Sequence, residues 1–237
     1  MKTLILFDID GTLVLTGHAG MRALDRALIE VCGRPGLLDG VSFAGRTDRA
    51  IISDALRTVH SGVDDLMFAE VRDRYCSYLS DEVRADSPHP KLVLPGVMTA
   101  LDRLRPLEAS GAVAVGLLTG NFAKGAEIKL GYFDLWQRFP FGAFGDGHVD
   151  RRDLVPLAIA AAERAGSGSF RPAEVVIVGD TPADVDCAHA HGARAIAVAT
   201  GTYSVEDLRA TGADLVVPDL SDWTRVWGAV YPRSPNQ

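Results

Sequence analysis

Cysteines, long apolar runs and excess positive charge are all scarce in this sequence, and each scarcity excludes a class of protein. The chain holds only three cysteines, which form no CxxC pair and lie far apart, so we predict neither a zinc cluster nor a disulfide framework. No stretch approaches the ~18 consecutive apolar residues of a membrane span. The formal net charge of −7 argues against general binding to nucleic acid or to anionic lipid.

The start of the chain lacks a recognisable targeting signal. Its first residues, MKTLILF, combine a lysine with a short apolar run, but Asp8 ends this run before it reaches the length of a secretory signal. Together with the few cysteines, this predicts a protein of the reducing cytoplasm that has no nucleic-acid or membrane partner. No feature of the sequence indicates an oligomeric state. At 237 residues the chain can bury a substantial core.

Short aliphatic runs bounded by turn residues are typical of strands buried on both faces of a parallel sheet. They cover residues 3–9, 112–119, 174–180, 193–200 and 214–220, with a weaker run at 140–146. Helical patterns lie between them, at 97–105, 122–135, 154–165 and 183–191. This alternation predicts an α/β fold built on a doubly wound, Rossmann-like parallel sheet.

The segment from residue 16 to residue 90 does not follow this alternation. It contains helical patterns at 21–31, 48–59 and 63–79 and no clear strand, and a proline-rich stretch follows at 84–95. We therefore predict that residues 1–15 and 91–237 form the α/β core. Residues 16–90 are predicted to form an inserted helical domain that hangs over the carboxyl ends of the strands.

In the run LILFDIDGTLV, four apolar residues lead to Asp8, which is followed closely by Asp10 and Gly11. An Asp-Gly pair between apolar runs is also a turn signal, which accounts for Asp10 and Gly11 but not for Asp8. A carboxylate at the end of so apolar a run is partly desolvated, so the cost of its charge requires compensation.

Polar side chains also follow two other predicted strands. They are Thr119, Gly120 and Asn121 after the second strand, and Asp180 and Asp184 after the strand at 174–180. Ligands of open α/β sheets bind where strands end, so these groups are predicted to face one crevice together with Asp8 and Asp10. A hard divalent cation would relieve the repulsion among the carboxylates, and their oxygens suit Mg²⁺ better than zinc.

These stretches resemble the motifs of the haloacid dehalogenase-like superfamily, in particular its phosphoglycolate-phosphatase-like members. DIDGT at 8–12 is similar to the first motif, LLTGN at 117–121 to the second, and VGDTPADV at 178–185 to the fourth. The resemblance spans most of the chain, from Asp8 to Asp184.

The resemblance implies a role for each acidic residue. Asp8 is implied as the nucleophile that forms an aspartyl-phosphate, and Asp10 as the general acid and base. A Mg²⁺ ion would be held by Asp8, by the backbone carbonyl of Asp10 and by Asp180, with Asp184 supporting them from behind. Because Asp8 and Asp10 are two residues apart on an extended strand, we expect them on the same face.

The second motif is implied to bind the phosphoryl group through Thr119 and Asn121, with backbone N–H donors around Gly120. An ordinary helix N-cap is the alternative for Thr119 and Asn121. A strand-ending turn is the alternative for Asp180, and a capped helix start at Thr181 and Pro182 is compatible with either role of Asp180.

The third motif, a single basic residue, has several candidates. Counting back from the fourth motif without gaps places Arg152 there, and a shift of one residue places Arg151 there. Lys129, on the predicted helix after the second motif, is a further candidate. A solvated loop arginine is the alternative for either arginine, and an arginine would depart from the more common lysine of the family.

The inserted helices resemble the family's helical cap, which closes over the site and selects the substrate. Arg46, in the stretch FAGRTDRA, is the predicted contact for a substrate anion, although this stretch also fits a loop leading into a capped helix. Residues 16–90 contain no lysine, which argues against a phosphonatase with a Schiff-base lysine in its cap. Asp10 argues against a dehalogenase.

We therefore predict a Mg²⁺-dependent phosphatase of a small phosphorylated metabolite, such as phosphoglycolate or a sugar phosphate. A sugar phosphomutase is the alternative within the family. A binding or regulatory protein that has lost catalysis on the same scaffold is the alternative from another class, and the intact pair of Asp8 and Asp10 argues against it.

Overall fold

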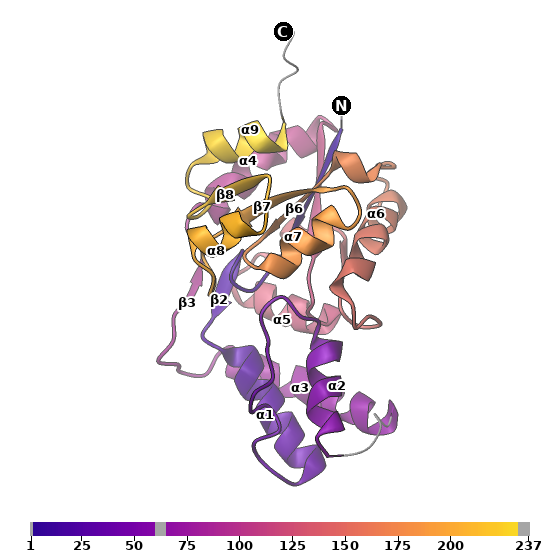
Figure 1. The fold of residues 1–237 in the computed structure, drawn as a ribbon, viewed down its shortest axis with the longest axis vertical. Coiled ribbons are helices and arrows are strands. Elements are labelled where there is room, and N and C mark those ends of the chain that lie inside the picture. The colour runs from indigo at the N-terminus through magenta and orange to yellow at the C-terminus, as the bar shows by residue number, and fades with distance from the viewer. Residues whose placement is uncertain (1, 60–64, 232–237) are drawn as a thin grey trace.

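A parallel sheet forms the centre of the structure, a computed structural model that describes residues 2–59 and 65–231 (Figure 1). Its strands are β1 (Thr3–Phe7), β4 (Val113–Leu118), β5 (Gly142–Ala143), β6 (Val175–Gly179), β7 (Arg194–Val198) and β8 (Leu215–Val217). Their order is β5-β4-β1-β6-β7-β8, and every pair is parallel. The predicted α/β fold is confirmed. Since β1 lies between β4 and β6, its carboxyl end is where crossovers to the two sides diverge, the place where such sheets bind ligands.

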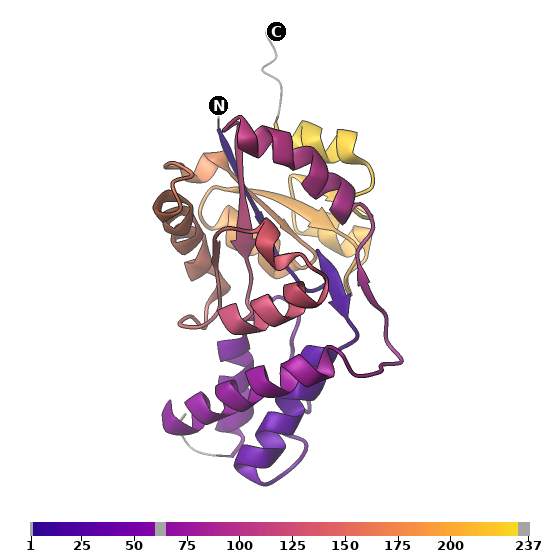
Figure 2. The same cartoon turned by 180° about the vertical axis from the view of Figure 1, so that it is seen from behind.

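Helices cover both faces of this sheet (Figures 1 and 2). One face carries α4 (Val97–Ala109), α5 (Ala123–Tyr132) and α9 (Trp223–Val230), and the other carries α6 (Leu154–Arg164), α7 (Pro182–His189) and α8 (Val205–Ala210). Alternate residues of β1 point to opposite faces, so Ile5 and Phe7 join one hydrophobic cluster while Leu4 and Leu6 join the other. Burial on both faces explains the continuous apolar runs of the sequence.

A second, small sheet was not predicted from the sequence. It pairs β2 (Val14–Thr16) with β3 (Lys91–Val93) in antiparallel orientation, with Val14 opposite Val93. Each strand has only three residues, and the two strands lie far apart along the chain, so no local sequence pattern predicts that they pair. This sheet joins the two chain segments that leave and re-enter the larger sheet.

The segment between β2 and β3 is here called the helical insert, and its described residues form three helices. They are α1 (Ala19–Cys32), α2 (Asp48–Arg57) and α3 (Asp65–Glu82), which confirms the predicted helices; residues 63 and 64 of the third lie outside the described residues. The insert has its own hydrophobic cluster, and Phe122 of the sheet part belongs to it. The exact division of the chain after residues 15 and 90 stays a prediction.

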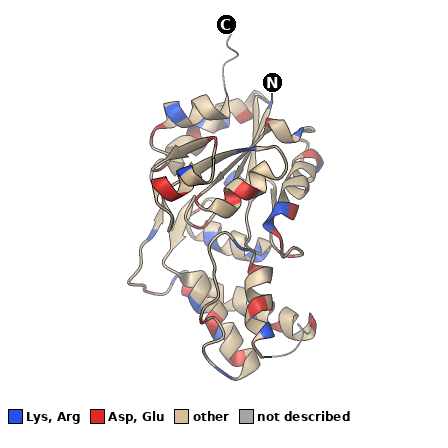
Figure 3. Ribbon diagram, viewed as in Figure 1, with Lys and Arg blue, Asp and Glu red and all other residues tan. Residues whose placement is uncertain are grey.

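Charged residues of both signs are interspersed along the ribbon of the sheet part and of the helical insert (Figure 3). Within the described ranges, no helix is both long enough and apolar enough to cross a membrane.

Candidate active site

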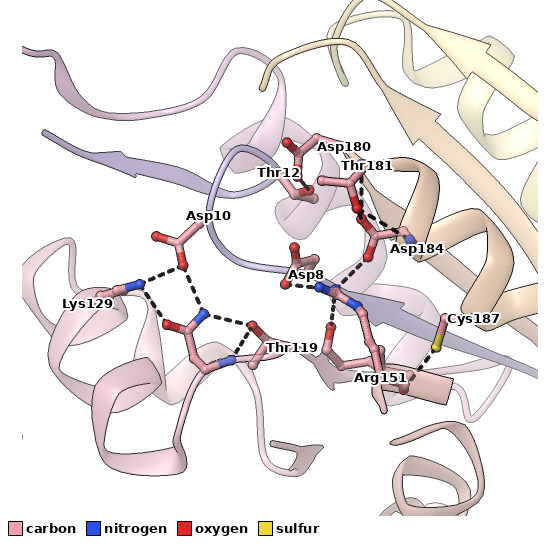
Figure 4. Close-up of polar contacts among 12 residues, drawn as sticks. Asp8, Asp10, Thr12, Thr119, Lys129, Arg151, Asp180, Thr181, Asp184 and Cys187 are labelled. Carbon is pink, nitrogen blue, oxygen red and sulfur yellow. Dashed lines mark hydrogen bonds and ion pairs between the residues drawn. The ribbon is translucent and has the colours of Figure 1, made fainter. Parts of the chain in front are cut away.

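A cleft of about 440 Å³ lies at the carboxyl ends of the central strands. Residues that follow β1, β4 and β6 line one side, among them Asp8, Thr119 and Asp180. Residues of the helical insert, including Met21 and Ile51, line the other side. The polar groups predicted from three separate strand ends therefore line one cleft, except Asp184, which lies behind it beside Asp8 and Arg151 (Figure 4).

Asp8 is held at the end of β1 by the sheet itself. Its backbone N–H donates to the carbonyl of Val178 at 2.9 Å, so the hydrogen bonding between β1 and β6 continues through it. The side chain is buried, and its Oδ1 lies 3.1 Å from Nη2 of Arg151. Burial raises the pKa of Asp8 to about 6, and the Arg151 guanidinium offsets part of this effect.

A tight turn follows Asp8, as the Asp-Gly pair predicts. Gly11 has φ +78°, and a Cβ atom at this position would lie 2.4 Å from Oδ2 of Asp180. Glycine is therefore required both for the backbone conformation and for the close approach of the Asp180 carboxylate. The hydroxyl of Thr12 donates to Oδ1 of Asp180 at 3.1 Å, which fixes the turn after β1 to the end of β6.

The carboxylates of Asp8, Asp180 and Asp184 form a buried cluster, with one oxygen of each lying within 4.8 Å of the others. Burial, together with Asp184 and Asp8, raises the pKa of Asp180 well above its usual range. A cluster of buried carboxylates fits a divalent cation with oxygen ligands, which would offset their mutual repulsion. Asp184 also completes a capping box with Thr181 at the start of α7, so the predicted capped helix start is confirmed.

Arg151, and not Arg152, lies beside this cluster. Its Nη2 donates to Oδ1 of Asp184 at 2.5 Å as well as lying near Asp8, and only 7% of its side chain is exposed. Burial acts to lower its pKa, but the two carboxylates outweigh burial and raise it. Arg152 instead lies 53% exposed and pairs with Asp150 at 2.7 Å. Of the two arginines, the structure therefore brings the one reached by a shift of one residue to the site.

Asp10 lies beyond the end of β1, so the alternation of an extended strand does not reach it. Its carboxylate turns away from the buried cluster, and its Oδ2 accepts hydrogen bonds from Nζ of Lys129 at 2.6 Å and from Nδ2 of Asn121 at 2.8 Å (Figure 4). Asp8 and Asp10 therefore bind different partners, although Asp10 is near enough to help raise the pKa of Asp8. The carboxylate grouped with Asp8 and Asp180 is that of Asp184.

Asn121 joins the first and second motifs. Its Oδ1 accepts from Lys129 at 2.6 Å, and its Nδ2 donates to the hydroxyl of Thr119 at 2.8 Å. The alternative that Thr119 or Asn121 is an ordinary N-cap is wrong, because the N-cap residue of α5 is Phe122. The first N–H groups of α5 are instead satisfied by carboxylates from outside the helix, including that of Asp48 at 2.9 Å.

The helical insert contributes acidic and aromatic groups to this side of the site. Asp48, at the start of α2, is half-buried close to Lys129, and desolvation raises its pKa to about 6. Burial and the neighbouring Asp48 raise the pKa of Tyr75 well above its usual range. The backbone N–H of Asp48 also donates to the carbonyl of Gly120 at 2.7 Å, so the second motif contacts the insert directly.

Arg46 lines the cleft but has a partner already. Its Nη2 lies 2.5 Å from Oδ2 of Asp54 on α2, and 30% of its side chain is exposed. A substrate anion would therefore compete with Asp54 for this guanidinium.

Asp48 and Tyr75 were not singled out from the sequence, and Lys129 was expected only as a third-motif candidate. The contact of Lys129 with Asp10 joins α5 to the turn after β1, and the approach of Asp48 to the second motif depends on how the insert packs on the sheet, so no local pattern records either contact. Thr12 could have been found from the sequence, because it belongs to the DIDGT stretch. Its hydroxyl donates to Asp180 and so joins the turn after β1 to the end of β6.

Comparison with known proteins shows similarity to hydrolases and phosphatases. A family model described as HAD-hydrolase-like matches residues 153–223. A phosphoglycolate phosphatase from Pseudomonas putida is 26% identical over 229 residues, covering 93% of this chain and 78% of that protein. A probable phosphatase, IndB, from Dickeya dadantii is 28% identical over 229 residues, covering 94% of this chain and 92% of that protein.

Among solved structures, CbbY from Rhodobacter sphaeroides in complex with phosphate is similar, with a TM-score of 0.69 at 17% sequence identity. The similarity covers 98% of this chain and 100% of that chain. At this identity the likeness shows a shared fold.

Proposed function

The chain belongs to the haloacid dehalogenase-like hydrolases and is a phosphatase of that superfamily, and from this premise we propose that it hydrolyses a small phosphorylated metabolite with the help of Mg²⁺. The observation that carries the proposal is the meeting of Asp8, Thr119 and Asp180 in one cleft beside the buried Arg151. These residues follow three separate strands, and together they offer a nucleophile, a hydrogen-bond donor and a site for a cation.

In the first half of the proposed reaction, a carboxylate oxygen of Asp8 attacks phosphorus in line. A P–O bond forms on Asp8 while the bond to the leaving oxygen breaks, and Asp10 gives that oxygen a proton. Thr119, Asn121 and the backbone around Gly120 hold the phosphoryl oxygens. Arg151 holds Asp8 in place for the attack, since its guanidinium already contacts that carboxylate.

In the second half, water attacks the aspartyl-phosphate and gives its proton to Asp10. The bond between Asp8 and phosphorus breaks, so phosphate leaves and both aspartates return to their starting states.

The residues around Asp8 fit a magnesium ion, because they supply hard oxygen ligands in a place where like charges are gathered. Asp8, Asp180 and the backbone carbonyl of Asp10 would hold it, with Asp184 behind them. When bound, the ion would offset the repulsion between the anionic nucleophile and the phosphate dianion.

Two relatives support a small phosphorylated metabolite as the substrate, since they are named as a phosphoglycolate phosphatase and a probable phosphatase. Phosphoglycolate and sugar phosphates are therefore the first compounds to test. The proposed role of Arg46 is contact with an anionic part of the substrate.

The test is a panel of phosphate monoesters, including an aryl phosphate, assayed for phosphate release with and without Mg²⁺ after treatment with a chelator. We expect Mg²⁺-dependent, stoichiometric release of phosphate, and Asp8→Asn is expected to lower the rate by at least ~10⁴-fold. Asp186→Asn is the matched control, because Asp186 is exposed and its carboxylate lies 3.9 Å from Arg152. Activity that survives Asp8→Asn would contradict the proposal, and isomerised sugar phosphate without released phosphate would indicate a mutase.

A further inference from the structure

Lys129 is a buried cation for which the proposed mechanism has no task. Arg151 occupies the position beside Asp8 that a third-motif base is expected to fill. Lys129 nevertheless lies only 5% exposed at the edge of the same cleft. Burying a long charged side chain is unfavourable unless its partners compensate, so the partners of this ammonium group indicate what it does.

These partners come from both parts of the molecule. Nζ of Lys129 donates to Asp10 and to Asn121, each at 2.6 Å. Asp48 of the helical insert is close enough to contribute to the charge balance at Lys129. On the insert side, a Cβ atom built on Gly20 would lie 3.4 Å from Nζ. The ammonium group is therefore enclosed between the turn after β1, the second motif and the insert.

The hydrogen bonds distinguish the two oxygens of Asp10. Oδ2 accepts hydrogen bonds from both Lys129 and Asn121, so a proton on this oxygen would compete with those two donors. Among the described residues, Oδ1 has no hydrogen-bond partner, and the side chain of Asp10 is 45% exposed. The proton that Asp10 transfers therefore belongs on Oδ1.

We propose that Lys129 is a positioning residue for proton transfer, which with Asn121 clamps Oδ2 of Asp10 and so presents Oδ1 to the leaving oxygen of the substrate. This inference rests on the proposed function. Lys129 does not touch the phosphate in this arrangement. It acts through Asp10, and a shift of a proton-transfer group by about 1 Å lowers a rate by about 10²-fold.

The inference predicts an effect that depends on the leaving group. An alkoxide needs a proton as it departs, so hydrolysis of an alkyl phosphate depends on the position of Oδ1. p-Nitrophenolate departs without a proton, so formation of the aspartyl-phosphate from p-nitrophenyl phosphate does not depend on that position. A merely structural role of Lys129 would slow both substrates alike.

The experiment compares single-turnover rates for the best alkyl phosphate of the panel with the rate of the initial p-nitrophenol burst. Lys129→Met is expected to raise the ratio of the p-nitrophenol rate to the alkyl rate by about 10²-fold. Lys129→Arg, which keeps charge and donors, is expected to recover part of the loss. Lys124→Met is the matched control, because Lys124 lies on the same helix, 62% exposed and paired with Glu127.

A double-mutant cycle tests whether the effect passes through Asp10. In an Asp10→Asn background, Lys129→Met is expected to change the ratio no further. Thermal unfolding is measured for every variant, and Lys129→Gln, a neutral donor, replaces Lys129→Met if the latter is unfolded at the assay temperature.

The outcomes separate this inference from the proposed function. The clamp is contradicted if the ratio of the p-nitrophenol rate to the alkyl rate is unchanged in the folded Lys129 variant. It is also contradicted if Lys129→Met changes this ratio as much in the Asp10→Asn background as in the unsubstituted protein. Either result leaves the phosphatase assignment intact. If Asp10→Asn instead slows the alkyl phosphate and p-nitrophenyl phosphate by the same factor, Asp10 is not the general acid, and the proposed mechanism is wrong.

Discussion

The two sides of the cleft are assembled in different ways. On the sheet side, Asp8, Asp180 and Arg151 are buried at strand ends or just before α6, and the sheet fixes their relative positions. On the insert side, Asp48 and Tyr75 reach the site from helices that have their own hydrophobic cluster. The residues proposed to attack the phosphate and to hold the cation thus lie on the sheet side, whereas Asp48 and Tyr75 reach the site where the insert packs against it.

This difference predicts which substitutions are the most damaging. The sheet side holds charges that are almost fully buried, so loss of one partner there leaves another poorly compensated. The insert side holds contacts between two separately packed parts, so a substitution there is expected to alter their fit rather than to leave a buried charge unpaired.

The largest effect is expected for Arg151→Met, which removes the cation between Asp8 and Asp184. Breaking a buried pair by deleting one partner costs about 3–5 kcal/mol, so the free energy of unfolding should fall by that amount in denaturant titrations without metal. Arg152→Met is the matched control, since Arg152 is the next residue in the sequence but is exposed and pairs with Asp150. Equal losses for the two variants would contradict the distinction between them.

The sheet side is the part that the sequence predicts well. Its strands are continuous apolar runs, and parallel strands bring their carboxyl ends to one edge, so Asp8, Thr119 and Asp180 could be placed together from the sequence. Arg151 could not be separated from Arg152 in this way, because the choice depends on the short 3₁₀ turn at Arg151–Asp153 that directs one side chain inward.

The insert side is the part that the sequence predicts poorly. Its helices could be predicted from their patterns, but the contacts of Asp48 and Lys129 join residues far apart in the chain. The paired strands β2 and β3 were missed for the same reason. Packing between two parts leaves no periodic signal in either.

The second effect is stabilisation by Mg²⁺, which should depend on pH. Without metal, burial raises the pKa of Asp8 from 3.8 to about 6, so between these values the folded state binds more protons than the unfolded state. Stability should therefore fall as pH rises through that window. Because the metal binds the ionised carboxylates, its stabilising effect should be larger at pH 8 than at pH 5.

At pH 8 and a Mg²⁺ concentration of 100 Kd, the expected gain in the free energy of unfolding is about 2.7 kcal/mol. Thermal unfolding at both pH values, with and without Mg²⁺, measures it. Asp180→Asn is expected to reduce the gain, whereas a gain of equal size at pH 5 and pH 8 would contradict the assignment of the cluster as the binding site.

A smaller effect is expected for Gly120→Ala, which disturbs the contact between the two sides. A Cβ atom at Gly120 would lie 2.1 Å from the backbone carbonyl oxygen of Arg46, so the insert must shift away. Overpacking of this kind costs about 1–3 kcal/mol, and KM for the substrate should rise as the cleft widens. Gly131→Ala is the control, because a Cβ atom there has nothing within 4 Å.

The smallest effect on stability is expected at Arg46, where an exposed ion pair with Asp54 contributes about 0–1 kcal/mol. Arg46→Ala should therefore leave thermal unfolding almost unchanged, yet raise KM for substrates that carry a second anionic group, such as phosphoglycolate. Asp54→Ala releases the same guanidinium from its partner and should lower that KM. Aryl phosphates without a second anionic group serve as the internal control for both variants. If both substitutions shift KM in the same direction, Arg46 shapes the loop at the edge of the cleft rather than contacting the substrate.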